Sequence, residues 1–172
     1  MTLDELRALA TVDRGGYHAF SGDYTAMAPA LEDVEFLYAL VRSVKPLLIV
    51  ETGTGLGVSA RFMAEALVEN GRGHLMTAEP RADLAARARE LLAGLPCDVG
   101  DWPTPDLIVL EPDLVFLDSG WDRREWEIEA WLSGSYRGLV VVHDANRNYA
   151  GLAAGTGVFL PGYQGLWLGR PR

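Results

Sequence analysis

The segment LLIVETGTGLGVSA, Leu47 to Ala60, joins a strand-like run to a helix-like run through a glycine-rich turn. The run up to Glu51 is apolar and partly β-branched, as in a strand buried on both faces of a parallel sheet. Gly53, Gly55 and Gly57 then follow at alternate positions, which allows a tight turn and the close approach of a ligand to the backbone. The segment therefore predicts a βα unit, with a turn that either binds a ligand or only links strand to helix.

Strand-like and helix-like segments alternate on the C-terminal side of this unit. The composition predicts strands at 47–52, 74–79, 97–101, 113–120 and 138–144, and helices at 58–71, 81–94 and 123–132. This alternation is typical of a doubly wound α/β sheet that is mostly parallel. Residues 156–160 and 165–169, on either side of a Pro-Gly pair, predict a closing antiparallel hairpin. Residues 101–112 contain two internal prolines and permit a loop, a short helix or a cramped strand.

Two further helices are expected before the first strand, at 2–10 and 31–44. Thr2 and Glu5 have the spacing of a capping box. Between the two helices, residues 15–29 predict a loop or lid that carries four aromatic or imidazole side chains, Tyr17, His18, Phe20 and Tyr24. We therefore divide the chain into N-terminal helices with a lid segment, 1–45, and a core, 46–172, within one structural domain.

The composition disfavours several classes of partner. The formal net charge is −9, from 24 acidic and 15 basic residues, and nucleic-acid binders instead gather Lys and Arg into patches. No apolar run approaches the roughly 20 residues that a membrane span needs, and no secretory signal pattern is present. The single cysteine, Cys97, cannot form an intrachain disulfide. We expect a soluble cytoplasmic protein that binds neither nucleic acid nor membrane.

The acids around the glycine turn indicate which cofactor it serves. The spacing G-x-G-x-G departs from the dinucleotide pattern G-x-G-x-x-G, and the P-loop pattern is absent. Glu51 precedes the turn, Glu79 ends the next expected strand, and the turn contains no Lys or Arg. Such a turn is a poor phosphate site, but it suits a nucleoside with a positively charged amino-acid tail, such as S-adenosylmethionine.

Five motifs in order then carry a family resemblance: the long segment that ends in VETGTGLGVSA, followed by TAEP, VGDW, DLVFLDSGWD and GLVVVHDAN. Between about Tyr24 and Tyr149 the chain resembles the class I S-adenosylmethionine-dependent methyltransferases. The resemblance is closer to their catechol and caffeoyl-CoA O-methyltransferase-like branch. It implies a Rossmann-like sheet of seven strands and O-methylation of a hydroxyl on a small molecule.

The resemblance also implies roles for individual residues in binding the cofactor. The turn residues would line its methionine and ribose part, Glu79 would accept hydrogen bonds from the ribose, and Asp118 would lie near the methyl donor. Asp101 falls where the family contacts the adenine, and Trp102 would stack on it. The residues implied to line the methionine and ribose part are Glu51, Gly53, Gly55, Gly57 and Ser59.

Three interpretations of the catalytic edge stay open. In the metal-dependent members of the family, an Asp after the fourth strand and an Asp-Asn pair after the fifth hold a divalent ion such as Mg²⁺. Asp118 and Asp144 match two of these ligands, but Ala145 stands where the family has Asn. In the metal-free alternative, His143 or Asp144 is the general base. A third interpretation is structural, in which the His-Asp pair only caps the next turn.

The expected acceptor is a small molecule whose pocket is bordered by Trp121, Asn146 and Tyr149. The short chain leaves open a homodimer that completes the pocket. Two other functions stay open: a protein that binds S-adenosylmethionine with lost or altered catalysis, and a nicotinamide-dependent oxidoreductase. The glycine spacing and the lack of a Tyr-x-x-x-Lys pair disfavour the oxidoreductase.

Overall fold

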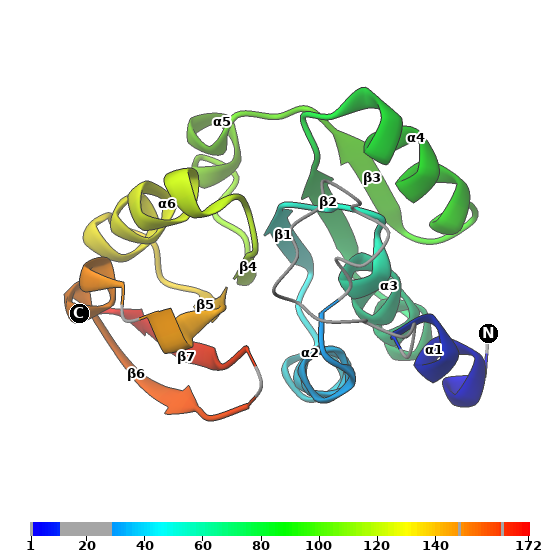
Figure 1. The fold of residues 1–172 in the computed structure, drawn as a ribbon, viewed down its shortest axis with the longest axis horizontal. Coiled ribbons are helices and arrows are strands. Elements are labelled where there is room, and N and C mark those ends of the chain that lie inside the picture. The colour runs from blue at the N-terminus through cyan, green and yellow to red at the C-terminus, as the bar shows by residue number, and fades with distance from the viewer. Residues whose placement is uncertain (1, 11–28, 148, 163) are drawn as a thin grey trace.

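The computed structural model describes residues 2–10, 29–147, 149–162 and 164–172. Its centre is a seven-stranded sheet with the order β3-β2-β1-β4-β5-β7-β6 (Figure 1). The strands β1 to β5 pair in parallel, β7 runs antiparallel to β5, and β6 runs antiparallel to β7. Their bounds are Leu48–Thr52 for β1, His74–Ala78 for β2, Cys97–Gly100 for β3, Leu114–Leu117 for β4, Leu139–His143 for β5, Gly155–Leu160 for β6 and Leu166–Pro171 for β7.

Six α-helices accompany the sheet in the described part of the chain. They are α1 (Leu3–Ala10), α2 (Leu31–Val44), α3 (Val58–Asn70), α4 (Ala82–Leu91), α5 (Thr104–Ile108) and α6 (Trp121–Ser133). Two short 3-10 helices, η2 (Ala145–Arg147) and η3 (Ala150–Ala154), follow β5.

The alternation of side chains along each strand separates two apolar layers. Ile49 of β1 is fully buried among residues of α2, α3 and α4, whereas its neighbour Val50 is fully buried among residues of α5 and α6. This is the pattern of a sheet covered on both faces. Helix α1 packs outside the first layer, where Leu6 contacts the cluster that contains Val34 and Phe62.

The expected fold class is confirmed, including the C-terminal antiparallel hairpin. The Thr2–Glu5 capping box is also confirmed, because the Thr2 N–H donates to Glu5 Oε2 at 2.7 Å and the Glu5 N–H donates to Thr2 Oγ1 at 3.2 Å. The ambiguous segment 101–112 contains the short helix α5 between loop residues, with Pro103 as its N-cap residue. No helix in the described ranges is long and apolar enough to span a membrane.

Two boundaries differ from the expectation in ways that matter for the site. Strand β4 ends at Leu117, so Asp118 is the first residue after it. Helix α6 begins at Trp121 rather than at residue 123, which places Arg124 in its first turn. The expected lid residues Tyr17, His18, Phe20 and Tyr24 lie outside the described residues, and the division at residues 45/46 stays a prediction.

Candidate functional site

The glycine turn lies where the strand order reverses between β1 and β4. Gly53 follows β1 with a φ of +87°, and a Cβ there would lie 2.2 Å from the backbone oxygen of Asp118. Only glycine permits both the left-handed conformation and this contact. The turn after β1 therefore lies against the first residue after β4, at the edge where open α/β sheets bind ligands.

Glu51 is fully buried at the base of this turn. Ser59 Oγ, in the first turn of α3, donates to Glu51 Oε1 at 2.5 Å, and Thr77 Oγ1 of β2 donates to Oε2. Burial raises the pKa of Glu51 to about 7, although these two hydrogen bonds favour the ionised form and lower it. Glu51 thus ties β1, β2 and α3 together, and its direct contact with a cofactor stays a prediction.

Glu79 is the second acid beside the turn. Its Oε2 accepts the N–H of Gly55 at 2.8 Å, and its Oε1 accepts the N–H of Arg81 at 3.0 Å. A carboxylate offers about four lone-pair positions, so Glu79 retains capacity for further donors such as ribose hydroxyls. The two bonds hold the carboxylate against the turn, where the sequence predicted it.

The expected adenine end lies at the close of β3. The Trp102 ring covers Gly100, where an added Cβ would lie 2.5 Å from a ring atom. Trp102 is half-buried and packs against the α5/α6 layer, whereas Asp101 is exposed. The Asp101 side chain is thus accessible, and the contacts of Asp101 and Trp102 with adenine stay predictions.

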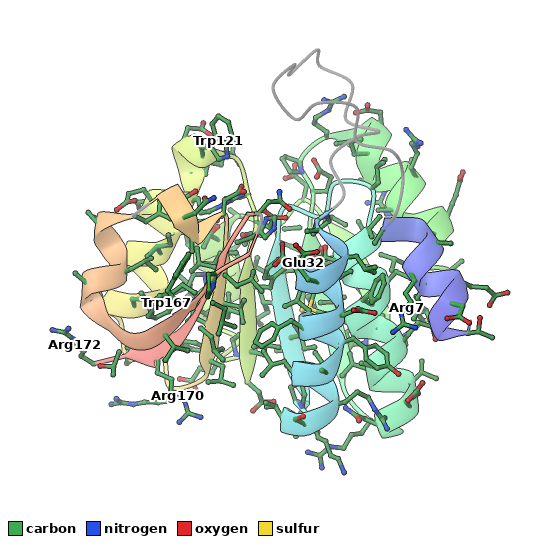
Figure 2. The ribbon with its side chains drawn as sticks, turned by 60° about the horizontal axis from the view of Figure 1, so that its bottom comes forward. Arg7, Glu32, Trp121, Trp167, Arg170 and Arg172 are labelled. Carbon is green, nitrogen blue, oxygen red and sulfur yellow. The ribbon has the colours of Figure 1, made fainter. Side chains whose placement is uncertain are left out.

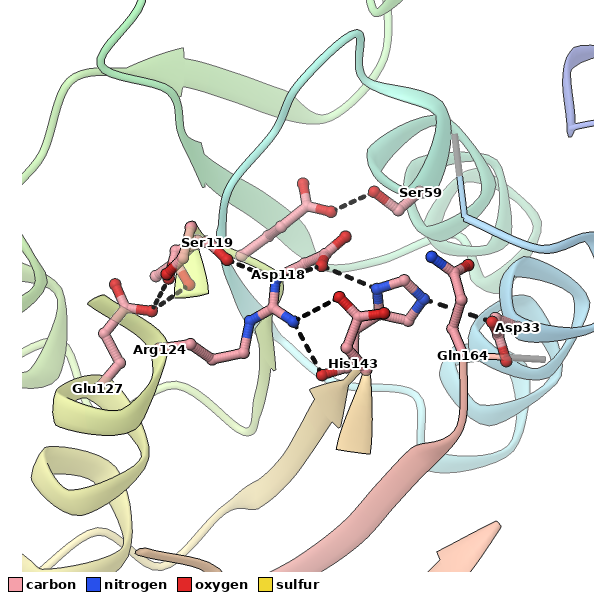
Figure 3. Close-up of polar contacts among 12 residues, drawn as sticks. Asp33, Ser59, Asp118, Ser119, Arg124, Glu127, His143 and Gln164 are labelled. Carbon is pink, nitrogen blue, oxygen red and sulfur yellow. Dashed lines mark hydrogen bonds and ion pairs between the residues drawn. The ribbon is translucent and has the colours of Figure 1, made fainter. Parts of the chain in front are cut away.

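The residues expected to catalyse converge at the ends of β4 and β5 (Figure 3). His143 Nδ1 lies 2.8 Å from Asp118 Oδ1, and its Nε2 lies 3.3 Å from Asp33 Oδ2, on α2. Burial alone would lower the pKa of His143, but the charge and hydrogen bond of Asp118, the hydrogen bond to Asp33 and the charge of Asp144 raise it to about 10. In its protonated form this histidine donates to two carboxylates and orients them.

Arg124 joins the two predicted metal ligands (Figure 3). Its Nη2 donates to Asp118 Oδ1 at 2.8 Å and its Nη1 donates to Asp144 Oδ2 at 2.9 Å. Nη1 also donates to the backbone oxygen of His143 at 3.0 Å, and Nη2 donates to that of Ser119. Burial lowers the pKa of Arg124, but the charge of Asp118, the interaction with Tyr149 and the hydrogen bond and charge of Asp144 together outweigh it and give a net rise. Two cationic side chains therefore stand among three carboxylates.

Asp118, His143 and Asp144 form the one group with metal-ligating spacing found among the described residues. One possible ligand atom from each lies within 4.8 Å of the other two. Asp144 has a φ of +53°, which is uncommon outside glycine and is concentrated at functional sites. The chain thus brings the predicted ligands together, with a guanidinium bonded to both carboxylates.

A second buried carboxylate supports the site from behind. Glu127 of α6 accepts hydrogen bonds from three hydroxyls that come from the ends of β1 and β4 and from α5. The donors are Thr52 at 2.9 Å, Thr104 at 2.8 Å and Ser119 at 2.5 Å. This network holds the residue after Asp118 in position.

The three expected substrate residues differ in their placement. The Tyr149 hydroxyl lies 3.4 Å from Arg124 Nη1, so Tyr149 belongs to the same cluster. Trp121 projects from the start of α6 and is 52% exposed (Figure 2). Asn146 is exposed on η2. Their contacts with an acceptor stay predictions.

Sequence reasoning missed Arg124, Asp33 and Glu127. In the sequence, Arg124 is one of two adjacent arginines that stand between Asp122 and Glu125. Its one signal was its position, shortly after the expected fourth strand and beside candidate anionic ligands. Asp33 stands in the first turn of an apolar helix and is itself 3% exposed, which distinguishes it from an ordinary surface acid only once the fold is known.

Comparison with known proteins finds similar structures but no similar sequences. No protein-family model matches the sequence, and no curated protein matches it. Among solved structures, the Podospora anserina methyltransferase PaMTH1 bound to SAH has a TM-score of 0.73 at 18% identity, over 90% of this chain and 83% of that one. The O-methyltransferase TomG from Streptomyces achromogenes, involved in tomaymycin synthesis and bound to SAM, has a TM-score of 0.71 at 20% identity, over 99% and 91%.

An O-methyltransferase from Bacillus cereus in complex with SAH matches with a TM-score of 0.70 at 20% identity, over 88% of this chain and 86% of that one. Each likeness extends over most of both chains. At identities of 18–20%, these likenesses show the fold and no more. As the motifs predicted, the chain has the Rossmann-like fold of the class I methyltransferases.

Proposed function

We propose that this protein is an S-adenosylmethionine-dependent methyltransferase that methylates a hydroxyl group of a small molecule. The observation that carries the proposal is the pair of acids at the ends of β1 and β2, around a glycine turn packed on Asp118. Acids without a basic residue in the turn suit a cationic cofactor better than a pyrophosphate.

Different residues would bind different parts of S-adenosylmethionine. Glu79 is held by two backbone N–H groups and would accept the ribose hydroxyls. Asp101 and Trp102 would contact the adenine. Asp118, the first residue after β4, would lie near the methyl donor. The similar structures bound to SAM or SAH support the same assignment.

For methyl transfer, the protein must orient the acceptor hydroxyl and accept its proton. When bound, S-adenosylmethionine supplies an electrophilic methyl group for in-line displacement. The Asp118 side chain is 18% exposed, against 9% for Asp144 and 3% for His143, so Asp118 is the most accessible of these three candidate groups. We assign proton acceptance to the Asp118/Asp144 carboxylates, with His143 and Arg124 orienting them.

Calorimetric titration tests the cofactor assignment. We expect the protein to bind S-adenosylmethionine and S-adenosylhomocysteine, and not NAD. Glu79→Gln should weaken both by about tenfold, because a charge-assisted acceptor becomes a neutral amide. Glu90→Gln, an exposed acid on α4, is the matched control and should bind as the wild type. Binding of NAD alone would refute the proposal in favour of an oxidoreductase.

Product formation tests catalysis separately. Incubation with S-adenosylmethionine and a panel of phenols, sugars and hydroxy-polyketides should yield S-adenosylhomocysteine with at least one acceptor class. Cofactor binding without this product across the whole panel would instead favour the alternative of a binding protein with lost or altered catalysis.

A further inference from the structure

We propose that the guanidinium of Arg124 takes the place of a divalent ion between Asp118 and Asp144, so that the acceptor site works without a metal. That this site binds a methyl acceptor rests on the proposed function. The contacts between Arg124 and the two carboxylates do not depend on it, because they lie within the chain itself.

The contacts of Arg124 are those of a built-in cation. Its two terminal nitrogens carry four N–H groups and face five acceptors: two carboxylates, two backbone carbonyls and the Tyr149 hydroxyl. The Arg124 side chain is only 3% exposed. A guanidinium is always charged and is suited to bridging two carboxylates. It therefore neutralises Asp118 and Asp144 from a fixed position.

A divalent ion does not fit beside this guanidinium. Mg²⁺ requires oxygen ligands at about 2.0–2.1 Å in near-octahedral geometry. The two carboxylates that would supply them already bond the Arg124 nitrogens at 2.8 and 2.9 Å, and Asp118 Oδ1 also bonds His143. Ala145, at the position of the family's third ligand, offers only a methyl group and is 2% exposed.

Arg124 is also held where it is. It lies in the first turn of α6, whose N-cap residue is Gly120, and its bonds to Ser119 and His143 involve their backbone oxygens. Removing the guanidinium to admit an ion would leave these buried carbonyls without a donor, which is costly. The cluster is therefore built around the guanidinium.

This arrangement restricts the acceptor. A divalent ion can chelate two adjacent oxygens and lower the pKa of a bound hydroxyl, which favours vicinal diols. The terminal N–H groups of Arg124 are directed at protein acceptors instead. The site thus suits a single acidic hydroxyl, such as that of a phenol or an enol, whose proton a carboxylate accepts directly.

Mn²⁺ binding, followed by electron paramagnetic resonance without cofactor or acceptor, tests the inference. We expect no binding by the wild type at concentrations that saturate an ordinary Mg²⁺ enzyme. Arg124→Met keeps an apolar stem and removes the charge, so Asp118 and Asp144, freed from the guanidinium, should bind Mn²⁺ at least about tenfold more tightly. Arg124→Lys keeps the charge and should exclude the ion as the wild type does. Circular dichroism checks that each variant is folded, and Arg124→Gln replaces Arg124→Met if the latter is not.

Stoichiometric Mn²⁺ binding by the wild type that Asp144→Asn abolishes would overturn the inference. So would a folded neutral variant that gains no affinity for Mn²⁺, because the guanidinium would then not be what fills the ion's place. If neither neutral variant folds, the wild-type titration decides. Mn²⁺ binding is measured without methyl transfer, so its outcome can be told apart from a failure of the proposed function. Where turnover is found, EDTA should leave its rate unchanged, and a loss that Mg²⁺ restores would also contradict the inference.

Discussion

Glu51 gives the protein a pH-dependent stability that one substitution should remove. The carboxyl group is fully buried and accepts hydrogen bonds from Ser59 and Thr77. Its pKa is raised from 4.5 to about 7, chiefly by burial. The folded state therefore holds this proton more tightly than the unfolded chain does. Raising the pH favours unfolding, because the unfolded chain ionises first.

The size of the effect follows from the shift. A difference of about 2.5 pKa units corresponds to about 3 kcal/mol of unfolding free energy. This stabilisation is fully present below pH 4.5 and is lost as the pH rises to about 7. Glu51→Gln has no ionisable group, and its amide can still bond both hydroxyls. We expect the difference in unfolding free energy, wild type minus Glu51→Gln, to fall by about 2–3 kcal/mol between pH 5 and pH 8.

Urea unfolding of both proteins at several pH values measures this difference while most other titrating groups cancel. Asp83→Asn is the control, because Asp83 is exposed and Arg81 lowers its pKa. That carboxylate is ionised throughout the range, so its difference from the wild type should stay flat above pH 5. A flat profile for Glu51→Gln as well would refute the reasoning, since Glu51 would then titrate as it does in the unfolded chain.

Three other substitutions test the site. Gly53→Ala should cost more than about 3 kcal/mol, because its Cβ would collide with the Asp118 backbone. Gly55→Ala, with a φ of +54° and open space around it, should cost only about 1 kcal/mol, and equal urea midpoints for the two variants would contradict this contrast. Glu127→Gln leaves one of three buried hydroxyls without its acceptor and should cost about 1–3 kcal/mol on thermal unfolding; no loss would refute a supporting role. Trp102→Ala should weaken S-adenosylhomocysteine binding by about tenfold in calorimetry, and unchanged affinity would argue against stacking.

The fold was predictable because its signals are local. The apolar run up to Glu51, the glycines after it and the helix-forming residues that follow each describe their own segment. Parallel strands joined by helices then allow few topologies. The same locality explains why Glu79 and Asp118 could be located in advance, since each follows directly from the end of a strand.

The polar cluster was less predictable because it depends on distances across the fold. Arg124 reaches Asp118 and Asp144 only because α6 begins at Trp121 and turns its first residues toward β5. Asp33 meets His143 from a helix 110 positions away in the sequence. A short sequence motif cannot predict contacts between residues so far apart. The bridging contacts of Arg124 and the contact of His143 with Asp33 are therefore seen only in the folded structure.

The order of the last strands has a consequence for how the protein is made. Strand β7, the last of the seven in the sequence, lies between β5 and β6, so β6 has no place in the sheet until residues 166–171 have been synthesised. Gln164, just before β7, accepts the Ala30 N–H at the start of α2 at 3.0 Å. During translation the Ala30 N–H therefore gains this acceptor only after residue 164 has been synthesised, and an early segment of the chain is joined there to a much later one.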